Sequence, residues 1–169
     1  REVELKDIYT IGHSRLVSSL SMSIALQLDP GYDILTLGAA VTFHDLGKYY
    51  TPIEILQKPG RLTPEEFSII KLHPQASWQL LMESHGEIIA EIALQHHERM
   101  DGSGYPRGLH ADAIRMNARI IAVADVFDAI TSKRSYNNPV SYEQALSIME
   151  QEQQLYDSDV LHALHILVR

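Results

Sequence analysis

Residues 34–46 read ILTLGAAVTFHDL, and this stretch decides the fold class. Nearly all of its residues are apolar or small, which predicts a helix that is buried on most of its sides. Asp33 precedes the stretch and is a typical N-terminal cap, and Gly47 follows it as a typical end. Near its end the predicted helix includes His44 and Asp45, so it carries two polar side chains into the interior of a helical domain.

The rest of the chain shows helical spacing of apolar residues, helix caps and helix breaks, without a β-hairpin signal. In residues 10–28 the apolar positions form one helix face, with His13 at its head. A capping box starts a helix at Thr63, and Pro74 places His73 at a junction between helices. We expect further helices at about 51–57, 75–83, 87–97, 112–132, 141–155 and from 157 onward. The sequence therefore predicts one all-α domain over residues 1–169, a bundle of about seven or eight helices.

The composition limits the class of protein. The chain has 169 residues, a net charge of −8, nine histidines and no cysteine, which suits one globular domain and excludes disulfides, thiol catalysis and thiolate metal sites. The acidic charge argues against polymeric nucleic acid as a partner. No apolar run reaches the about 18–20 residues of a membrane helix, so we expect a cytoplasmic domain without direct membrane insertion. Because the chain begins at Arg1 rather than Met, we expect it to be excised from a longer multidomain regulator. This regulator could be attached to a membrane.

Seven polar side chains fall on helix faces that point inward. A single histidine on such a face is more often a hydrogen-bonded core residue than a ligand, but adjacent buried polar pairs cost about 1–3 kcal/mol for each unsatisfied group. Metal ions would offset these costs, and nitrogen and oxygen donors without sulfur suit Fe, Mn or Zn. Seven donors suit two ions that share an aspartate, the arrangement of a two-metal hydrolase. The candidate ligands are His13, His44, Asp45, His73, His96, His97 and Asp125.

The order of the motifs resembles that of a known family. His44-Asp45 followed by Gly47-Lys48 resembles the signature of HD-superfamily phosphohydrolases, and residues 96–106, HHERMDGSGYP, resemble that of the HD-GYP subfamily. Further matching blocks at residues 9–14, 58–63, 71–74 and 123–125 extend the resemblance over nearly the whole chain. Members of this subfamily are bacterial phosphodiesterases of cyclic dinucleotides, chiefly cyclic di-GMP, with a bimetallic and often iron-containing centre.

The resemblance implies two divalent ions, Fe or Mn first, with Zn, Ni or Mg as alternatives. One ion would be held by His13, His44, Asp45 and Asp125, and the other by His73, His96 and His97. Asp45 would bridge them. A hydroxide shared by the ions would attack the phosphorus in line and give the linear dinucleotide, and mononucleotides if cleavage continues.

The resemblance also implies roles around the metals. Lys48 would be catalytic together with Asp45 by stabilising transition-state charge, although a lysine there also suits the C-terminal end of a helix dipole. Glu98 and Asp101 would orient ligands or the lysine; the alternative is that they only solvate the loop. The substrate would be bound by Gly104, Tyr105, Pro106, Arg134 and Asp7. A rigid turn is the alternative for Tyr105, and a solvated charge is the alternative for Arg134.

Several positions depart from the family pattern. Tyr9 stands where some relatives carry a carboxylate for a third metal, which favours two metals here. Ser135 and Asn137 replace residues common in the family, so one phosphate or base contact is weaker or absent. Tyr49 and Tyr50 follow Lys48, where they could narrow the pocket or stack a base, but packing is the simpler interpretation. Four histidines match no ligand position and are assigned to the surface or to incidental packing: His85, His110, His162 and His165.

Three functions compete. The leading one is a phosphodiesterase of cyclic di-GMP or cyclic GMP-AMP. The second is another HD-superfamily nucleotide phosphohydrolase, against which residues 96–106 count. The third is a non-catalytic sensor of the cyclic dinucleotide, or a module that docks GGDEF-type diguanylate-cyclase proteins through the loop at 102–106. Loss of metal ligands would favour the third function, and every ligand position is kept.

Overall fold

The computed structural model describes residues 2–132 and 139–169, and within them the side chains from residue 15 onward. In these ranges the chain forms nine α-helices, three short 3-10 helices and no strand. The α-helices are α1 (Glu2–Leu28), α2 (Ile34–Phe43), α3 (Ile53–Leu56), α4 (Pro64–Ile70), α5 (His73–His85), α6 (Glu87–Gln95), α7 (Met116–Thr131), α8 (Tyr142–Gln151) and α9 (Ser158–Val168). The 3-10 helices are η1 (Leu46–Tyr50), η2 (Ala111–Ala113) and η3 (Gln153–Leu155). Since α3 is a single turn of 4 residues, the predicted all-α bundle of about seven or eight helices is confirmed.

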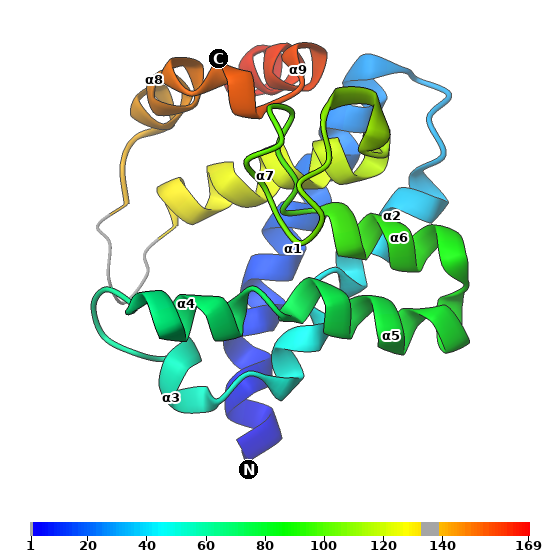
Figure 1. Ribbon diagram of the computed structural model, residues 1–169. Coiled ribbons are helices and arrows are strands. Elements are labelled where there is room, and N and C mark those ends of the chain that lie inside the picture. Colours follow the sequence, from blue (N-terminus) through cyan, green and yellow to red (C-terminus); the bar gives the residue numbers. More distant parts are fainter. Residues whose placement is uncertain (1, 133–138) are drawn as a thin grey trace.

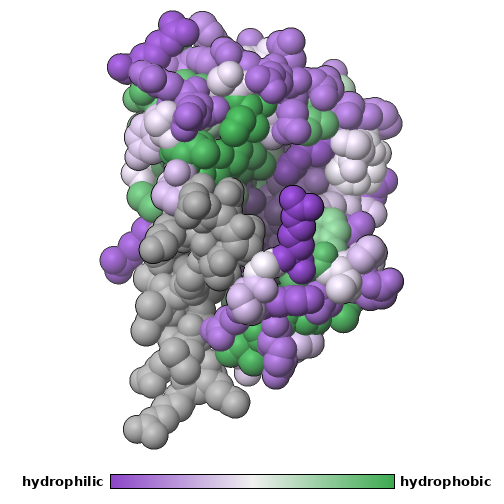
Figure 2. Space-filling model, turned by 90° about the vertical axis from the view of Figure 1, so that its left-hand side faces the viewer, coloured by the Kyte–Doolittle hydropathy of each residue, from purple (hydrophilic) through white to green (hydrophobic). Residues whose placement is uncertain are grey.

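The long helix α1 and helix α7 form the centre of the bundle, and the other helices surround them (Figure 1). α2, α7 and α9 pack against α1, while α6 and η1 both pack against α5. α2 also packs against α6, so the bundle brings the end of α2, the start of α5 and the end of α6 close together. On the face shown in Figure 2 the surface is hollowed; the inside of this recess is hydrophilic, and part of its rim is hydrophobic.

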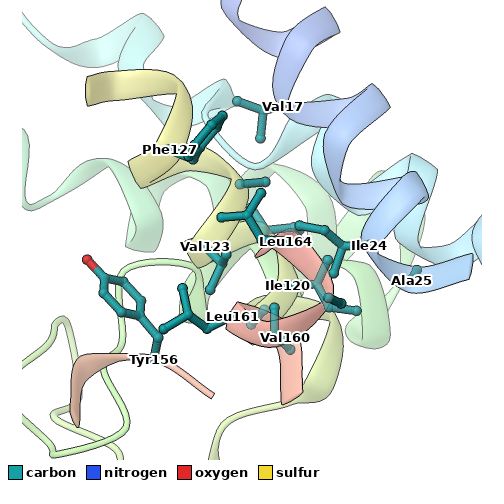
Figure 3. Packing of buried hydrophobic residues seen from close by; sticks show 14 of the residues in the cluster. Val17, Ile24, Ala25, Ile120, Val123, Phe127, Tyr156, Val160, Leu161 and Leu164 are labelled. Carbon is teal, nitrogen blue, oxygen red and sulfur yellow. The ribbon is translucent and has the colours of Figure 1, made fainter. Parts of the chain in front are cut away.

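Apolar side chains of α1, α7 and α9 make the main core (Figure 3). Ile24 of α1, Ile120 of α7 and Leu164 of α9 are fully buried, and each such side chain contributes about 1.5–3 kcal/mol of hydrophobic free energy. The core therefore fixes α1 and α7 relative to each other, and these two helices carry the candidate ligands His13 and Asp125.

Helix α2 ends earlier than predicted. Asp33 caps its start, because the Thr36 amide donates to the Asp33 carboxylate at 3.2 Å. Its last residue is Phe43, and His44 and Asp45 form a turn that leads into η1. The prediction that the helix continues to residue 46 and ends at Gly47 was wrong. The reason is a tertiary contact. The backbone at Gly47 packs directly on the backbone of α5, where a β-carbon on Gly47 would lie 2.1 Å from the His73 carbonyl oxygen. To make this contact the chain leaves the axis of α2 and turns into η1.

The other boundaries follow the sequence signals with small shifts. Both predicted capping boxes are present, at Thr63 and at Ser141. α4 ends at Ile70 and α5 begins at His73, so the predicted junction is confirmed. α1 begins at Glu2 rather than near residue 10, α7 begins after the extended Arg115, and α8 ends at Gln151. No helix in the described ranges is long and apolar enough to cross a membrane.

Candidate metal centre

Four of the predicted ligands meet where α2, α5 and α6 converge. Asp45 lies in the turn before η1, His73 is the first residue of α5, and His96 and His97 directly follow α6. One donor atom from each residue lies within 4.8 Å of the donor atoms of the other three. Asp45, His73 and His96 are buried, and His97 is partly buried. We call these four residues the Asp45 cluster.

The same hydrogen bond orients three of the imidazole rings. The Nδ1 atoms of His44, His73 and His96 lie 2.6–2.7 Å from the carbonyl oxygen three residues earlier in the chain. Because a carbonyl oxygen can only accept, each Nδ1 carries a hydrogen, and in the neutral ring each Nε2 then presents a lone pair. Backbone geometry at the helix ends therefore prepares all three Nε2 atoms as acceptors or metal ligands.

These acceptors converge on one another. The Nε2 atoms of His73 and His96 are 3.3 Å apart, and they lie 3.1 and 3.6 Å from Oδ1 of Asp45. When both rings bind a metal through Nε2, their lone pairs and the carboxylate would repel at these distances without a cation, and a cation between them would remove the repulsion. Imidazole nitrogen and carboxylate oxygen are donors that suit divalent Fe, Mn or Zn. The residues present thus fit a divalent metal ion.

Electrostatics keep the cluster in its ligating protonation states. Burial opposes ionisation of Asp45, but the Lys48 ammonium and the neighbouring imidazoles outweigh it and hold the Asp45 pKa well below its usual range. Burial lowers the pKa of His96 to about 4, although Asp45 opposes this shift. Burial and the nearby His96 also lower the pKa of His97, a residue that keeps some accessible surface. At neutral pH His96 and His97 are therefore neutral and Asp45 is charged.

The depressed pKa of His96 predicts a pH-dependent stability. The unfolded chain binds a proton on this residue below pH of about 6.5, while the folded chain does so only below about 4. The metal-free protein should therefore lose stability as the pH falls from 6.5 towards 4. Urea unfolding of the parent and of His96→Gln across this range tests the prediction.

The parent's unfolding free energy should fall more steeply with decreasing pH than that of His96→Gln. The matched control is His162→Gln, which changes an exposed histidine and should keep the parent's slope. Equal slopes for all three proteins would contradict the assignment.

The remaining predicted ligands lie beside the cluster or outside the described residues. Nε2 of His44 is 3.5 Å from Oδ2 of Asp45, and the His44 ring meets the His96 ring edge to face at 4.8 Å. Asp125 on α7 is partly buried, and its charge acts on the pKa of His97, so it lies on the same side of the bundle. The side chains of His13 and Asp7, and all of Arg134, lie outside the described residues.

Lys48 lies directly at the cluster. Its Nζ is 2.6 Å from Oδ2 of Asp45, three residues earlier, which is one turn of the 3-10 helix η1. The lysine side chain is 30% exposed, so its ammonium group stays in contact with solvent while it pairs with Asp45. This arrangement puts a cation at the open side of the candidate metal centre.

The loop at residues 98–110 packs on the cluster through Tyr105. The rings of Tyr105 and His97 stack at 4.8 Å and 25°, and Lys71 lies over the Tyr105 ring at 5.9 Å. Gly104 permits this approach, because a β-carbon there would lie 2.4–2.5 Å from backbone atoms of residues 97–99. One face of the tyrosine ring therefore supports His97 and is not open to a base.

Glu98 holds the loop closed. It is 2% exposed, and its carboxylate accepts hydrogen bonds from the amides of Arg107 and Leu109 at 2.7 and 2.9 Å. Asp101 is exposed, and its carboxylate accepts hydrogen bonds from the amide and the hydroxyl of Ser103, two residues later in the chain. The two acids that the sequence grouped together thus have different environments.

This difference predicts unequal effects on stability. Glu98→Ala leaves two loop amides without their acceptor, at about 1–3 kcal/mol each if they stay buried, so we expect a loss of about 2–4 kcal/mol. Asp101→Ala removes a local exposed contact and should cost less than about 1 kcal/mol. Urea unfolding measures both variants, and an equal loss would contradict the role assigned to Glu98.

Sequence reasoning missed Ser77. Its hydroxyl accepts from the Gly47 amide and donates to the His44 carbonyl oxygen, both at 2.8 Å. This fully buried serine ties the His44-Asp45 turn to the first half of α5. A serine inside a predicted helix carries no signal of such a role, since its two contacts span 30 and 33 positions of the chain.

Comparison with known proteins decides the family. A family model described as HD domain matches residues 1–160. The chain belongs to the HD domain family. Its resemblance to this family, predicted from the motifs around Asp45 and residues 96–106, is thereby confirmed.

Relatives of this HD domain include cyclic dinucleotide phosphodiesterases. It is 44% identical over 165 residues to a cyclic di-GMP phosphodiesterase of Thermotoga maritima, which covers 95% of this chain and 45% of that protein. It is 41% identical over 152 residues to 3'3'-cGAMP-specific phosphodiesterase 1 of Vibrio cholerae, covering 89% of this chain and 35% of that protein. The chain thus spans less than half the length of these two relatives.

A solved structure shares the fold. Bd1817, a HDG"Y"P protein from Bdellovibrio bacteriovorus, superposes with a TM-score of 0.75 over 92% of this chain and 51% of that chain, at 22% sequence identity. At this level of identity the likeness shows the fold alone. It agrees with the all-α bundle described above.

Proposed function

We propose that this HD domain is a metal-dependent phosphodiesterase that hydrolyses a cyclic dinucleotide, with cyclic di-GMP as first candidate and cyclic GMP-AMP as second. The observation that carries the proposal is the convergence of His73, His96 and Asp45, whose acceptor atoms face one another within 3.6 Å. Relatives at about 40% identity are named as phosphodiesterases of these two compounds. We take residues 1–169 as one such catalytic domain of a longer regulator.

Two divalent ions, Fe or Mn, would be held at the proposed centre, and Asp45 would serve as a ligand to both. His73, His96 and His97 would hold one ion, and His13, His44 and Asp125 would hold the other. Bound divalent ions supply a nucleophile at neutral pH and polarise phosphoryl oxygens. The depressed pKa values of Asp45 and His96 support this proposal, because they keep both groups deprotonated without help from the metal.

The protein's own groups would bind and orient the diester. Lys48 projects an ammonium group beside Asp45 and would neutralise charge that develops on the phosphoryl oxygens. Tyr105 supports His97, and its hydroxyl is the part left for the phosphate. Burial raises the pKa of this hydroxyl, although the Arg99 charge opposes the shift, and keeps it a hydrogen-bond donor.

The loop and three further positions complete the proposed site. Gly104 permits the close approach of the loop, and Glu98 holds it closed. Pro106 lies beside Tyr105 and is exposed, where substrate or a GGDEF-type partner would reach it. Asp101, Arg134 and Asp7 remain predictions of the family resemblance.

Product analysis tests the function. The protein is loaded with Fe or Mn without oxygen and incubated with cyclic di-GMP, cyclic GMP-AMP and cyclic di-AMP, and the products are separated by chromatography. We expect the linear dinucleotide from cyclic di-GMP, cyclic GMP-AMP or both, and mononucleotides if cleavage continues. Binding of a cyclic dinucleotide without cleavage of any of the three would contradict the enzyme and favour a sensor or docking module.

A further inference from the structure

Lys71 carries a positive charge that the described part of the chain does not neutralise. Its ammonium group forms no ion pair and no hydrogen bond with any side chain that the structure describes; its contacts there are with aromatic rings. The side chain is only partly exposed, and a charged group that loses part of its hydration costs free energy unless a partner replaces the water. Other cations of this acidic chain have carboxylate partners: Lys48 with Asp45, Lys58 with Glu66, Arg107 with Glu91, and Arg119 with Asp157.

Two aromatic rings hold the Lys71 ammonium in place. Lys71 follows the last residue of α4, and its Nζ lies 5.0 Å from the ring centroid of Phe67 and 5.9 Å from that of Tyr105. The two rings meet edge to face at 6.3 Å. Such cation–π contacts attract the charge, but they leave the three N–H donors of the ammonium without an acceptor. The position of Lys71 is thus fixed, while its hydrogen bonds remain available to a ligand.

The same contacts connect Lys71 to the candidate metal centre. The Tyr105 ring, over which Lys71 lies, stacks on the ring of His97 at 4.8 Å, and His97 belongs to the Asp45 cluster. Along the chain, Lys71 stands two residues before His73, whose ring meets that of His97 at 5.0 Å. Only the Tyr105 ring therefore separates the ammonium from a candidate metal ligand. Lys48 contacts the cluster at Asp45, and Lys71 approaches it beside His97.

We propose that Lys71 binds the second phosphate of the cyclic dinucleotide. This inference rests on the proposed function, in which the metal centre and Lys48 take the phosphate that is cleaved. A cyclic dinucleotide carries two phosphodiester groups in one closed ring, so the other negative charge must lie close to the first. An ammonium with free N–H donors suits phosphate oxygens, because charge-assisted hydrogen bonds are stronger than neutral ones. Lys71 is the cation near the cluster that no carboxylate of the described chain occupies.

Isothermal titration calorimetry of the Mn-loaded protein tests this assignment. The ligand with two phosphates is the bis-phosphorothioate analogue of cyclic di-GMP, which keeps both negative charges and resists hydrolysis. Guanosine 5'-monophosphate has one phosphate, which the metal centre and Lys48 would take. In Lys71→Met, which keeps the length of the side chain and removes its charge, Kd for the analogue should rise about tenfold. Kd for the mononucleotide should stay close to that of the parent.

Two matched variants make the result specific. Lys71→Arg keeps a cation at the same position and should return Kd for the analogue towards the parent value. Arg115→Met removes an exposed cation about 15 Å along α7 from Asp125 and should leave both Kd values unchanged. Elemental analysis and urea unfolding address the alternative that Lys71 only steadies the Tyr105 ring. A steadying role predicts that Lys71→Met binds less Mn and binds both ligands more weakly to the same extent.

Each outcome bears on Lys71 separately from the proposed function. A higher Kd for the analogue alone, with parental Mn content and recovery in Lys71→Arg, supports the second phosphate site even if the protein binds the dinucleotide without cleaving it. An equal rise for both ligands, or no rise for either, would overturn this site, while product analysis decides the proposed function. A Mn-loaded parent that does not bind the analogue would overturn the site as well.

Discussion

Asp45→Ala should lose both divalent metal and cyclic dinucleotide hydrolysis. Its carboxylate is the group on which the cluster converges, 3.1 Å from Nε2 of His73 and 3.6 Å from Nε2 of His96. Without it, two imidazoles face each other with no anionic ligand beside them. Metal ions contribute several kcal/mol to transition-state stabilisation, so we expect turnover to fall about a thousandfold or more.

Two further variants make this result specific. Asp45→Asn keeps the shape of the side chain and removes its charge, and it should lose metal while unfolding as cooperatively as the parent. Asp112→Ala removes a fully exposed acid and should keep metal content and turnover. Elemental analysis of the dialysed proteins and chromatographic product assays measure both quantities. Parental metal content and hydrolysis in Asp45→Ala would refute the assignment of the centre.

Gly47→Ala should cost about 2–3 kcal/mol of stability and lower metal affinity as well. The added β-carbon would lie 2.1 Å from the His73 carbonyl oxygen and 2.6 Å from the Ser77 amide nitrogen. Both are backbone atoms near the start of α5, so η1 must move away from α5 to make room. That movement separates Asp45, which η1 follows, from His73, which begins α5.

The same substitution elsewhere provides the control. Gly38 lies inside α2, and a β-carbon there meets no atom within 4 Å. Gly38→Ala should therefore stabilise the protein by about 0.5–1 kcal/mol, because alanine loses less entropy than glycine in a helix. Urea unfolding gives both free energies, and metal titration gives the affinity. A harmless Gly47→Ala would contradict the direct contact between η1 and α5.

Local signals predicted most of the fold. Caps at Asp33, Thr63 and Ser141 and the break at Pro74 are contacts between near neighbours in sequence, so they could be predicted from residue types and spacing. The end of α2 could not. It depends on the contact of Gly47 with His73, and nothing near Gly47 in the sequence shows that α5 lies there.

The candidate site divides in the same way. Helical spacing predicted that His73, His96 and His97 face the interior, and the structure brings them together with Asp45. The environments of Glu98 and Asp101 depend on how the loop at residues 98–110 folds, and the conformation of this loop could not be predicted from its composition. Tyr49 and Tyr50 are exposed, and their exposure is likewise a tertiary property, since an apolar ring next to buried residues is equally consistent with packing.

Anomalous X-ray diffraction from crystals of the Mn-loaded protein, measured at the manganese absorption edge, tests most directly whether the Asp45 cluster is a metal centre. We predict an anomalous peak from a manganese ion within bonding distance of Nε2 of His73, Nε2 of His96 and the carboxylate of Asp45. A fully loaded crystal without a peak among these three residues would contradict the metal centre and the hydrolysis derived from it.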